Sequence, residues 1–304
     1  MEYFTLSNEE KIPAIGFGPG ICGYSDKYKE PKSKIISIPF KAYNKLIRRP
    51  MLQDSYINAV AAAIKSGYRL IDYSASYGDG SLIKKSIDRS SINRNELFLT
   101  TRVSNRAQFS NTVKEEFFSQ LHNLGVDYVD ILMFHWPVTE KWEDTWLRMV
   151  EFYKAGYCRM LGVANCHQHH LDRIAEISDV MPVINQIEVH PLFTQLPLRT
   201  YCKKHGIQIE AYTPIARFDD RLMRLPLLKK IAAKYGKTVP QIVLRWHIEN
   251  KLIPCVRSLN IAHQKANLDI FNFKLTKEEV EKIDSININA RVRYDPDNCD
   301  FTIL

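Results

Sequence analysis

Short apolar runs rich in β-branched residues recur along the whole chain, and amphipathic stretches of helical length separate them. We expect strands at Ile12–Gly18, Leu70–Asp72, Leu97–Arg102, Val129–Phe134, Met160–Ala164, Val183–Glu188, Gln208–Tyr212 and Ile253–Val256. Strands that alternate with helices in this way pack side by side as a parallel sheet with the helices outside. Eight such units in 304 residues favour an α/β fold of the (β/α)8 or TIM barrel type over an open, doubly wound sheet.

The helices follow the same alternation. We expect them at Asp54–Ser66, Gly80–Asp88, Thr112–Asn123, Glu143–Ala155, His167–Ile177, Leu196–Lys204, Pro226–Tyr235 with Val239–Glu249, and Ile261–Leu268. A further helix, Lys277–Ile286, follows Thr276, and Glu279 stands where a capping box places its carboxylate. Because this helix lies beyond the eightfold repeat, the barrel is expected to carry an extra C-terminal helix and a tail.

Composition limits the remaining possibilities. No Gly/Ser-rich or Pro-rich linker divides the chain, so residues 1–304 are expected to form a single domain. The N-terminus has no signal-peptide pattern and no apolar run approaches the roughly 18 residues of a membrane helix, so we expect a cytoplasmic protein without membrane contact. The six cysteines are far apart and include no C-x-x-C pair, which predicts reduced thiols and no metal site. The net charge of +8 is spread along the chain and does not indicate nucleic-acid binding.

Polar residues stand at the ends of the expected strands, where barrel enzymes gather their chemistry. They are Asp72, Arg102, His135, Asn165, Gln186 with Glu188, Tyr212 and Arg257. Tyr77 follows Asp72 by five residues. A phenol titrates near ~10 unaided, so a tyrosine that donates its proton at neutral pH needs a nearby cation and a buried counter-ion. The series of strand ends supplies candidates for both.

A glycine-rich turn invites a different interpretation. Gly18–Gly23 fits the pattern G-x-G-x-x-G after a strand, as in dinucleotide-binding folds with an open sheet. That fingerprint requires a helix to begin at the turn, whereas the next residues are polar, lysine-rich and end in Pro31. A strand-to-loop turn is therefore the preferred interpretation.

Several long motifs, in order, resemble those of the aldo-keto reductase family from about Ile12 to the C-terminus. They are Gly67-x-Arg69-x-Ile71-Asp72 with Tyr77, Asp127-Tyr128 leading to His135-Trp136-Pro137, Leu161–Asn165, Asn185–Glu188 with His190-Pro191, Ala211–Pro214, Tyr235–Thr238 and Leu244–Trp246. The family consists of (β/α)8 barrels that reduce carbonyls with NADPH. The resemblance implies a catalytic tetrad of Asp72, Tyr77, His135 and, where the family has lysine, Arg102. Tyr77 would protonate the carbonyl oxygen, and His135 would orient the substrate.

The resemblance also implies contacts to the nicotinamide. Asn165 and Gln186 resemble the pair that holds its carboxamide, and Ala164 stands where the family commonly has serine. Tyr212 resembles the residue on which the nicotinamide ring stacks, with Thr213 beside it at the cofactor site. These five residues are therefore expected at the nicotinamide end of the cofactor.

Other residues resemble those that bind the adenosine 2′-phosphate. Arg257 and Ser258 follow the last strand, and Arg257 can form charge-assisted hydrogen bonds to a phosphate. His263 stands at a common arginine position, Ala266 at a common glutamate position, and Asn267 is retained. The expected cofactor is NADP(H) in preference to NAD(H).

The remaining departures concern the substrate side. Residues 24–53 look like a loop insertion, which is a lid, a partner surface or a disordered segment, and its length favours disorder. Gly78-Asp79-Gly80 stands where the family usually has x-Asn-Glu, and Trp136 is a candidate wall of an apolar substrate pocket. The tail from Arg291 to Phe301 resembles bacterial members, in which the C-terminal loop helps to close the pocket.

We therefore expect an NADP-dependent aldo-keto reductase that acts on a small aldehyde or ketone as a monomer or weak homo-oligomer. An alternative is a catalytically weak NADP(H)-binding sensor or interaction subunit on the same barrel, which Arg102, Ala164 and the basic loop favour. The tetrad residues that are retained favour the enzyme.

Overall fold

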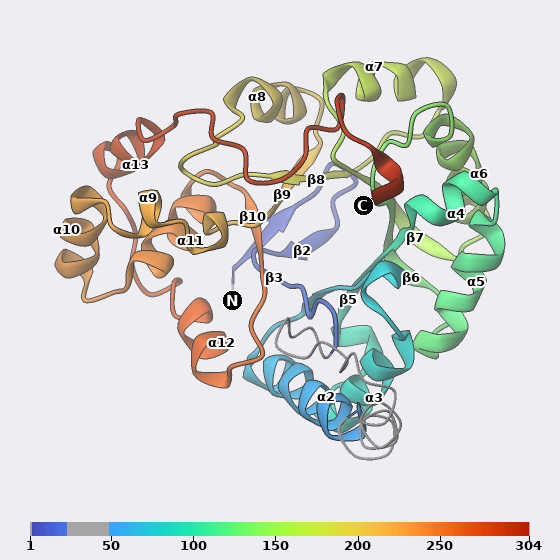
Figure 1. Cartoon of the computed structure of the whole chain (residues 1–304), viewed down its shortest axis with the longest axis horizontal. Helices are drawn as coiled ribbons and strands as arrows, with labels where there is room; N and C mark the ends of the chain where they lie inside the picture. The colour runs from blue at the N-terminus through green and yellow to red at the C-terminus, as the bar shows by residue number, and fades with distance from the viewer. Residues whose placement is uncertain (1, 23–48, 304) are drawn as a thin grey trace, which may run out of the picture.

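Eight parallel strands close into a barrel in the computed structural model, which describes residues 2–22 and 49–303 (Figure 1). They are β3 (Gly16–Phe17), β4 (Leu70–Asp72), β5 (Phe98–Val103), β6 (Val129–Phe134), β7 (Cys158–Ala164), β8 (Ile184–Glu188), β9 (Gln208–Tyr212) and β10 (Ile253–Val256). The strands follow one another around the barrel in chain order, and β10 pairs with β3 to close it. The expected barrel is confirmed, and its strand ends meet at one mouth.

The prediction of a single barrel strand at Ile12–Gly18 is wrong for the first part of this segment. Its first part belongs to a separate hairpin, in which β2 (Lys11–Pro13) pairs antiparallel with β1 (Tyr3–Thr5). The Ala14 N–H donates to the Glu2 carbonyl, so the backbone remains paired with the N-terminal segment at this point. Only Gly16 and Phe17 enter the barrel, which sequence alternation does not reveal because both parts are apolar.

Helices surround the barrel as expected (Figure 1). They are α2 (Arg49–Ser66), α3 (Gly80–Ser90), α4 (Asn105–Ser110), α5 (Val113–Leu124), α6 (Trp142–Lys154), α7 (Gln168–Ile177), α8 (Leu196–Lys204), α9 (Asp220–Met223), α10 (Pro226–Tyr235), α11 (Val239–Glu249), α12 (Ile261–Leu268) and α13 (Lys277–Asp284). The sequence patterns missed the short helices α4 and α9. Within the described ranges, no helix combines the length and hydropathy that a membrane crossing requires.

The extra helix α13 begins with the capping box that its sequence predicts. The Thr276 hydroxyl accepts the Glu279 N–H at 3.2 Å, and a Glu279 carboxylate oxygen accepts the Thr276 N–H at 2.9 Å, which completes the capping box. The indole N–H of Trp246, on α11, donates to Asp284 at 2.9 Å. The expected insertion at 24–53 overlaps α2, which begins at Arg49, and residues 23–48 lie outside the described part of the chain.

Candidate active site

A cavity of about 810 Å³ opens at the carboxyl ends of the barrel strands. The lining includes most of the residues expected from the sequence, namely Asp72, Tyr77, His135, Trp136, Asn165, Gln186, Tyr212, Thr213, Arg257, Ser258, His263, Ala266 and Asn267. Arg102 and Ala164 do not line it, because both are buried within the barrel wall. The structure therefore brings the expected cofactor and catalytic residues to one cavity and places the guanidinium behind it.

Arg102 forms an ion pair with Asp72 inside the barrel. An Arg102 Nη2 hydrogen donates to Asp72 Oδ1 at 2.5 Å, and the Arg102 side chain is fully buried. Register places both residues on neighbouring strands, β5 and β4, near their carboxyl ends. Thr100 donates its hydroxyl to the same carboxylate oxygen at 2.7 Å, and Arg102 Nη1 donates to the Tyr73 carbonyl at 3.0 Å. Removal of two charges from water is tolerated only when such bonds satisfy them.

Gln186 joins this pair through both ends of its amide. Arg102 Nη2 also donates to Gln186 Oε1 at 2.6 Å, and Gln186 Nε2 donates to Asp72 Oδ2 at 3.2 Å. The resemblance assigned Gln186 to the nicotinamide carboxamide. In the structure its oxygen accepts from the guanidinium and one of its two N–H groups donates to the carboxylate.

Tyr77 and His135 face each other in the cavity. The phenol oxygen lies 3.5 Å from His135 Nε2, and the two rings meet edge to face. Tyr77 comes from a short 3₁₀ turn after β4, whereas His135 follows β6 directly. Among the described residues, Tyr77 has no hydrogen bond to Arg102, because the fork of the guanidinium points to Asp72, Gln186 and Tyr73.

The electrostatic surroundings act on these two groups in different directions. Burial raises the pKa of the Tyr77 phenol above its ordinary value, and the charge of Arg102 offsets part of this rise. Burial, together with Arg102, lowers the pKa of His135 to about 3. His135 is therefore neutral throughout the physiological pH range. A neutral imidazole and a protonated phenol form a hydrogen-bonding pair with a proton available for donation.

The sequence patterns missed Glu210 and Cys255, which also meet this network. Cys255, on β10, directs its thiol to Asp72 Oδ2 at 3.4 Å, and Glu210, on β9, is fully buried. Glu210 stands two residues before Tyr212, and alternate residues of a strand share a face. That spacing was a usable signal for an inward-pointing carboxyl group.

The C-terminal tail supplies a further cation. Glu188 at the end of β8 accepts the backbone N–H groups of Val292 and Arg293 at 2.7 and 2.9 Å, and His190 Nε2 lies 2.9 Å from the same carboxylate. This anchor holds the tail so that Arg293 lines the cavity. Figure 1 shows the tail in red, crossing the barrel near β8 and β9.

The wall beside the phenol carries backbone strain. Asn165 and Thr213 follow β7 and β9 with φ of 62° and 46°. A left-handed conformation is unusual for a β-branched residue such as Thr213, and strain of this kind costs about 1–3 kcal/mol. Tyr212 donates its hydroxyl to Asn165 Oδ1 at 2.7 Å, while the buried Thr213 hydroxyl has no hydrogen-bond partner among the described residues. A polar ligand in the cavity can satisfy this hydroxyl.

Another part of the cavity holds the cationic side chain of Arg257. Arg257 and His263 line it beside Asn267, and Asn260 caps α12 by accepting the Ala262 N–H at 2.8 Å. Gly20 has a φ of 64°, and a Cβ there would lie 2.5 Å from Arg257 Nε, so a larger residue would be strained and would displace this guanidinium. A guanidinium near the start of a helix suits a phosphate group. Arg257 and the start of α12 therefore make this part of the cavity a candidate site for a phosphate group.

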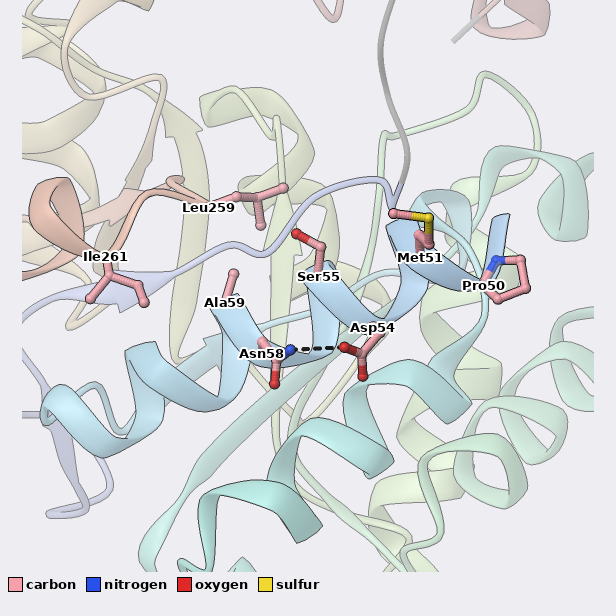
Figure 2. Close-up of a pocket in the computed structure, with 8 residues that line it drawn as sticks. All are labelled: Pro50, Met51, Asp54, Ser55, Asn58, Ala59, Leu259 and Ile261. Atoms are coloured by element: carbon pink, nitrogen blue, oxygen red, sulfur yellow. Dashed lines mark hydrogen bonds between the residues drawn. The ribbon is translucent and has the colours of Figure 1, made fainter. Parts of the chain in front are cut away.

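A second hollow lies over α2 but carries no comparable chemistry. Figure 2 shows Ser55 and Ala59 of α2 in the neighbourhood of Leu259 and Ile261, with Asn58 bonded to Asp54 at 3.0 Å. The Asp54 carboxylate also accepts from Arg89 at 2.7 Å. Its one ionisable side chain is engaged, so the proton-donating cavity remains the candidate active site.

A barrel that holds a buried carboxylate–cation pair beneath a phenol and a neutral imidazole is typical of oxidoreductases that protonate a carbonyl oxygen. The model of the Aldo/keto reductase family matches residues 44–288. The chain belongs to this family, and the resemblance drawn from its motifs is confirmed.

Relatives and solved structures agree with that assignment. Uncharacterized oxidoreductase YtbE of Bacillus subtilis (strain 168) is 39% identical over 249 residues, which are 81% of this chain and 88% of the relative. Glyoxal reductase of the same organism is 38% identical over 239 residues, or 79% of this chain and 86% of the relative. The crystal structure of Bombyx mori aldo-keto reductase (AKR2E4) in complex with NADP is 31% identical, with a TM-score of 0.80 over 97% of this chain and 96% of that one.

The site predicts a measurable contribution of Thr100 to stability. Thr100→Val keeps the shape of the side chain but removes the hydroxyl that donates to Asp72. A buried hydrogen bond to a charged group contributes about 1.5–3 kcal/mol, so the free energy of unfolding in urea should fall by about that amount. The matched control, Thr200→Val on the exposed face of α8, should change it by less than about 0.5 kcal/mol. An equal effect of the two substitutions would contradict the assignment.

Proposed function

We propose that the protein reduces small aldehydes and ketones, with dicarbonyls as the preferred class, by hydride transfer from NADPH. The observation that carries the proposal is the pair formed by Tyr77 and His135 in a cavity backed by the Asp72–Arg102 ion pair. Glyoxal reductase, among the relatives, supports the substrate class. The NADP complex of the silkworm protein supports the cofactor, NADP(H).

Different residues of this chain would have different roles in such a reaction. NADPH, when bound, supplies the hydride to the carbonyl carbon. Tyr77 gives its phenolic proton to the carbonyl oxygen as negative charge develops there. His135 Nε2 is 3.5 Å from the phenol oxygen, so an oxygen that bonds Tyr77 also reaches the imidazole. Because His135 is neutral, it orients the carbonyl without competing for the proton.

Arg102 acts on this step through space. Its charge lowers the pKa of Tyr77, in opposition to burial. The two terminal nitrogens of the guanidinium donate to Asp72, Gln186 and the Tyr73 carbonyl, whereas its buried Nε–H has no partner among the described residues. The lysine that the family has at this position carries three N–H donors on a compact ammonium that can rotate. The N–H donors of arginine lie in one plane and point in fixed directions. We therefore propose a working reductase whose protonation step is slower than lysine would allow.

The candidate phosphate site supports NADP(H) over NAD(H). Arg257 and His263 line it, and the hydroxyl of Ser258 is nearby in the same cavity wall. Asn165 and the unpartnered hydroxyl of Thr213 would hold the nicotinamide end, together with Tyr212. Gln186 is held by Arg102 and Asp72, and it would reach the carboxamide through the rest of its amide.

A second candidate is an NADP(H)-binding subunit with little catalysis. The specific observation in its favour is that Arg102 makes no hydrogen bond to Tyr77 among the described residues. Tight NADPH binding without turnover of any carbonyl would select this alternative.

Turnover of NADPH tests the proposal directly. Purified protein should bind NADPH, followed by intrinsic fluorescence, and should consume it, followed by absorbance, with glyoxal or phenanthrenequinone. Tyr77→Phe removes the proton donor and should lower kcat by about 10² to 10⁴-fold while the Kd for NADPH remains unchanged. Tyr157→Phe, at a half-exposed tyrosine on the outside of the barrel, is the control. If Tyr77→Phe retained full kcat, Tyr77 would not be the proton donor.

The proposed role of Arg102 leads to a separate prediction. Arg102→Lys should raise kcat by about 10- to 100-fold, since repositioning of a catalytic group by about an ångström changes rates on that scale. The ammonium can pair with Asp72 and still direct a donor toward Tyr77. Arg173→Lys, on the exposed face of α7, should leave kcat unchanged. A fall in kcat on Arg102→Lys would show that the pocket is built around the guanidinium.

A further inference from the structure

Glu210 is a buried carboxyl group that the reaction described above does not use. Its side chain has no exposure to solvent, and neither carboxyl oxygen has a hydrogen-bond partner among the described residues. It lies on β9, paired in register with Gln186 on β8. A buried carboxylate without donors is strongly unfavourable. The protonation state of this group therefore requires an explanation.

The neighbours of Glu210 come from every strand packed against it. Asp72 on β4 and Cys255 on β10 place their acidic atoms within 4.8 Å of it and of each other. Arg102 on β5 supplies positive charge, and Gln186 lies alongside on β8. Gly16 on β3 leaves room for the carboxyl, since a Cβ there would lie 3.2 Å from Glu210 Oε1. Two carboxyl groups and one guanidinium thus lie close together inside the barrel.

Charge balance decides which carboxyl carries a proton. Asp72 already accepts hydrogen bonds from Arg102, Thr100, Gln186 and Cys255, which satisfy its anionic form. The Glu210 oxygens have no hydrogen-bond partner among the described residues, and the nearby Arg102, Gln186 and Cys255 side chains only partly offset the rise in its pKa. When two carboxyl groups share a site, the pKa of one is strongly raised. Burial first, and then the charge of Asp72, raise the pKa of Glu210 to about 8.

We propose that Glu210 is a positioning residue that keeps a proton at neutral pH and, by losing it, sets the alkaline limit of carbonyl reduction. With that proton in place, the Asp72, Arg102 and Glu210 network has no net charge. When the proton leaves to solvent, the network carries one negative charge beneath Tyr77. This charge opposes the negative charge that develops on the carbonyl oxygen and makes the phenol a weaker acid.

Glu188 offers a contrast within the same barrel. It is also fully buried, but it accepts the N–H groups of Val292 and Arg293 and contacts His190. Donors of this kind stabilise a carboxylate. The two glutamates, each fully enclosed by protein, thus differ in the donors that surround them, and a comparison between them isolates the effect of those donors.

Infrared spectroscopy of the apoprotein tests the proton independently of activity. The carbonyl stretch of a protonated carboxyl group should be present at pH 7, disappear as the pH rises past about 8, and be absent from Glu210→Gln. Glu188→Gln should retain the band. Absence of the band from the wild type at pH 7, or its persistence in Glu210→Gln, would overturn the proposal. This measurement stands even if no carbonyl substrate is turned over.

The pH dependence of kcat with NADPH and glyoxal tests whether Glu210 sets the alkaline limit. This test rests on the proposed function. Wild-type kcat should fall about tenfold for each pH unit above about 8, and Glu210→Gln should lack this fall up to about pH 9.5. Cys255→Ser should keep the fall, which excludes the thiol as the titrating group. If Glu210→Gln showed the wild-type fall, Glu210 would not set the alkaline limit.

Discussion

Asp72 and Arg102 are removed from water together, and the arrangement of the barrel interior follows from the need to satisfy both charges. The desolvation penalty of a buried ion pair can exceed the Coulombic gain unless further hydrogen bonds compensate. Here Thr100 and Gln186 donate further hydrogen bonds to the Asp72 carboxylate. The Tyr73 carbonyl and the Gln186 amide oxygen accept hydrogen bonds from the Arg102 guanidinium. Thus three strands, β4, β5 and β8, contribute to a single polar network inside the barrel.

That network determines what the cavity above it can do. Arg102 lowers the pKa of His135 further than burial alone, which keeps the imidazole neutral, and it counteracts the effect of burial on Tyr77. Glu210 adds a second carboxyl group whose charge the single guanidinium does not balance. The arginine is therefore more than a replacement for lysine, because its fork also captures Gln186.

Much of the fold was predictable because local patterns and tertiary structure agree. The bounds of β4, β6, β9 and β10 coincide with the expected strands. The division of Ile12–Gly18 between hairpin and barrel was not predictable, because pairing partners far away in the sequence decide it. The proposed insertion remains an expectation, since residues 23–48 lie outside the described part.

The site was predictable to a more limited extent. Motif order identified the residues that line the cavity, including Tyr77 and His135. It could not show that Ala164 is enclosed in the wall or that Arg102 engages Gln186, because these depend on side-chain reach across strands. It also missed Glu210, whose importance comes from its distance to Asp72 and not from any motif.

The crystal structure of the complex with NADPH is the measurement that tests the central claim most directly. We expect Arg102 to remain bound to Asp72, with no guanidinium nitrogen within hydrogen-bonding distance of the Tyr77 oxygen. Asn165 and Thr213 should then hold the nicotinamide end, while Gln186 stays with the ion pair. A guanidinium that donates directly to Tyr77, with Gln186 released to the carboxamide, would contradict the account.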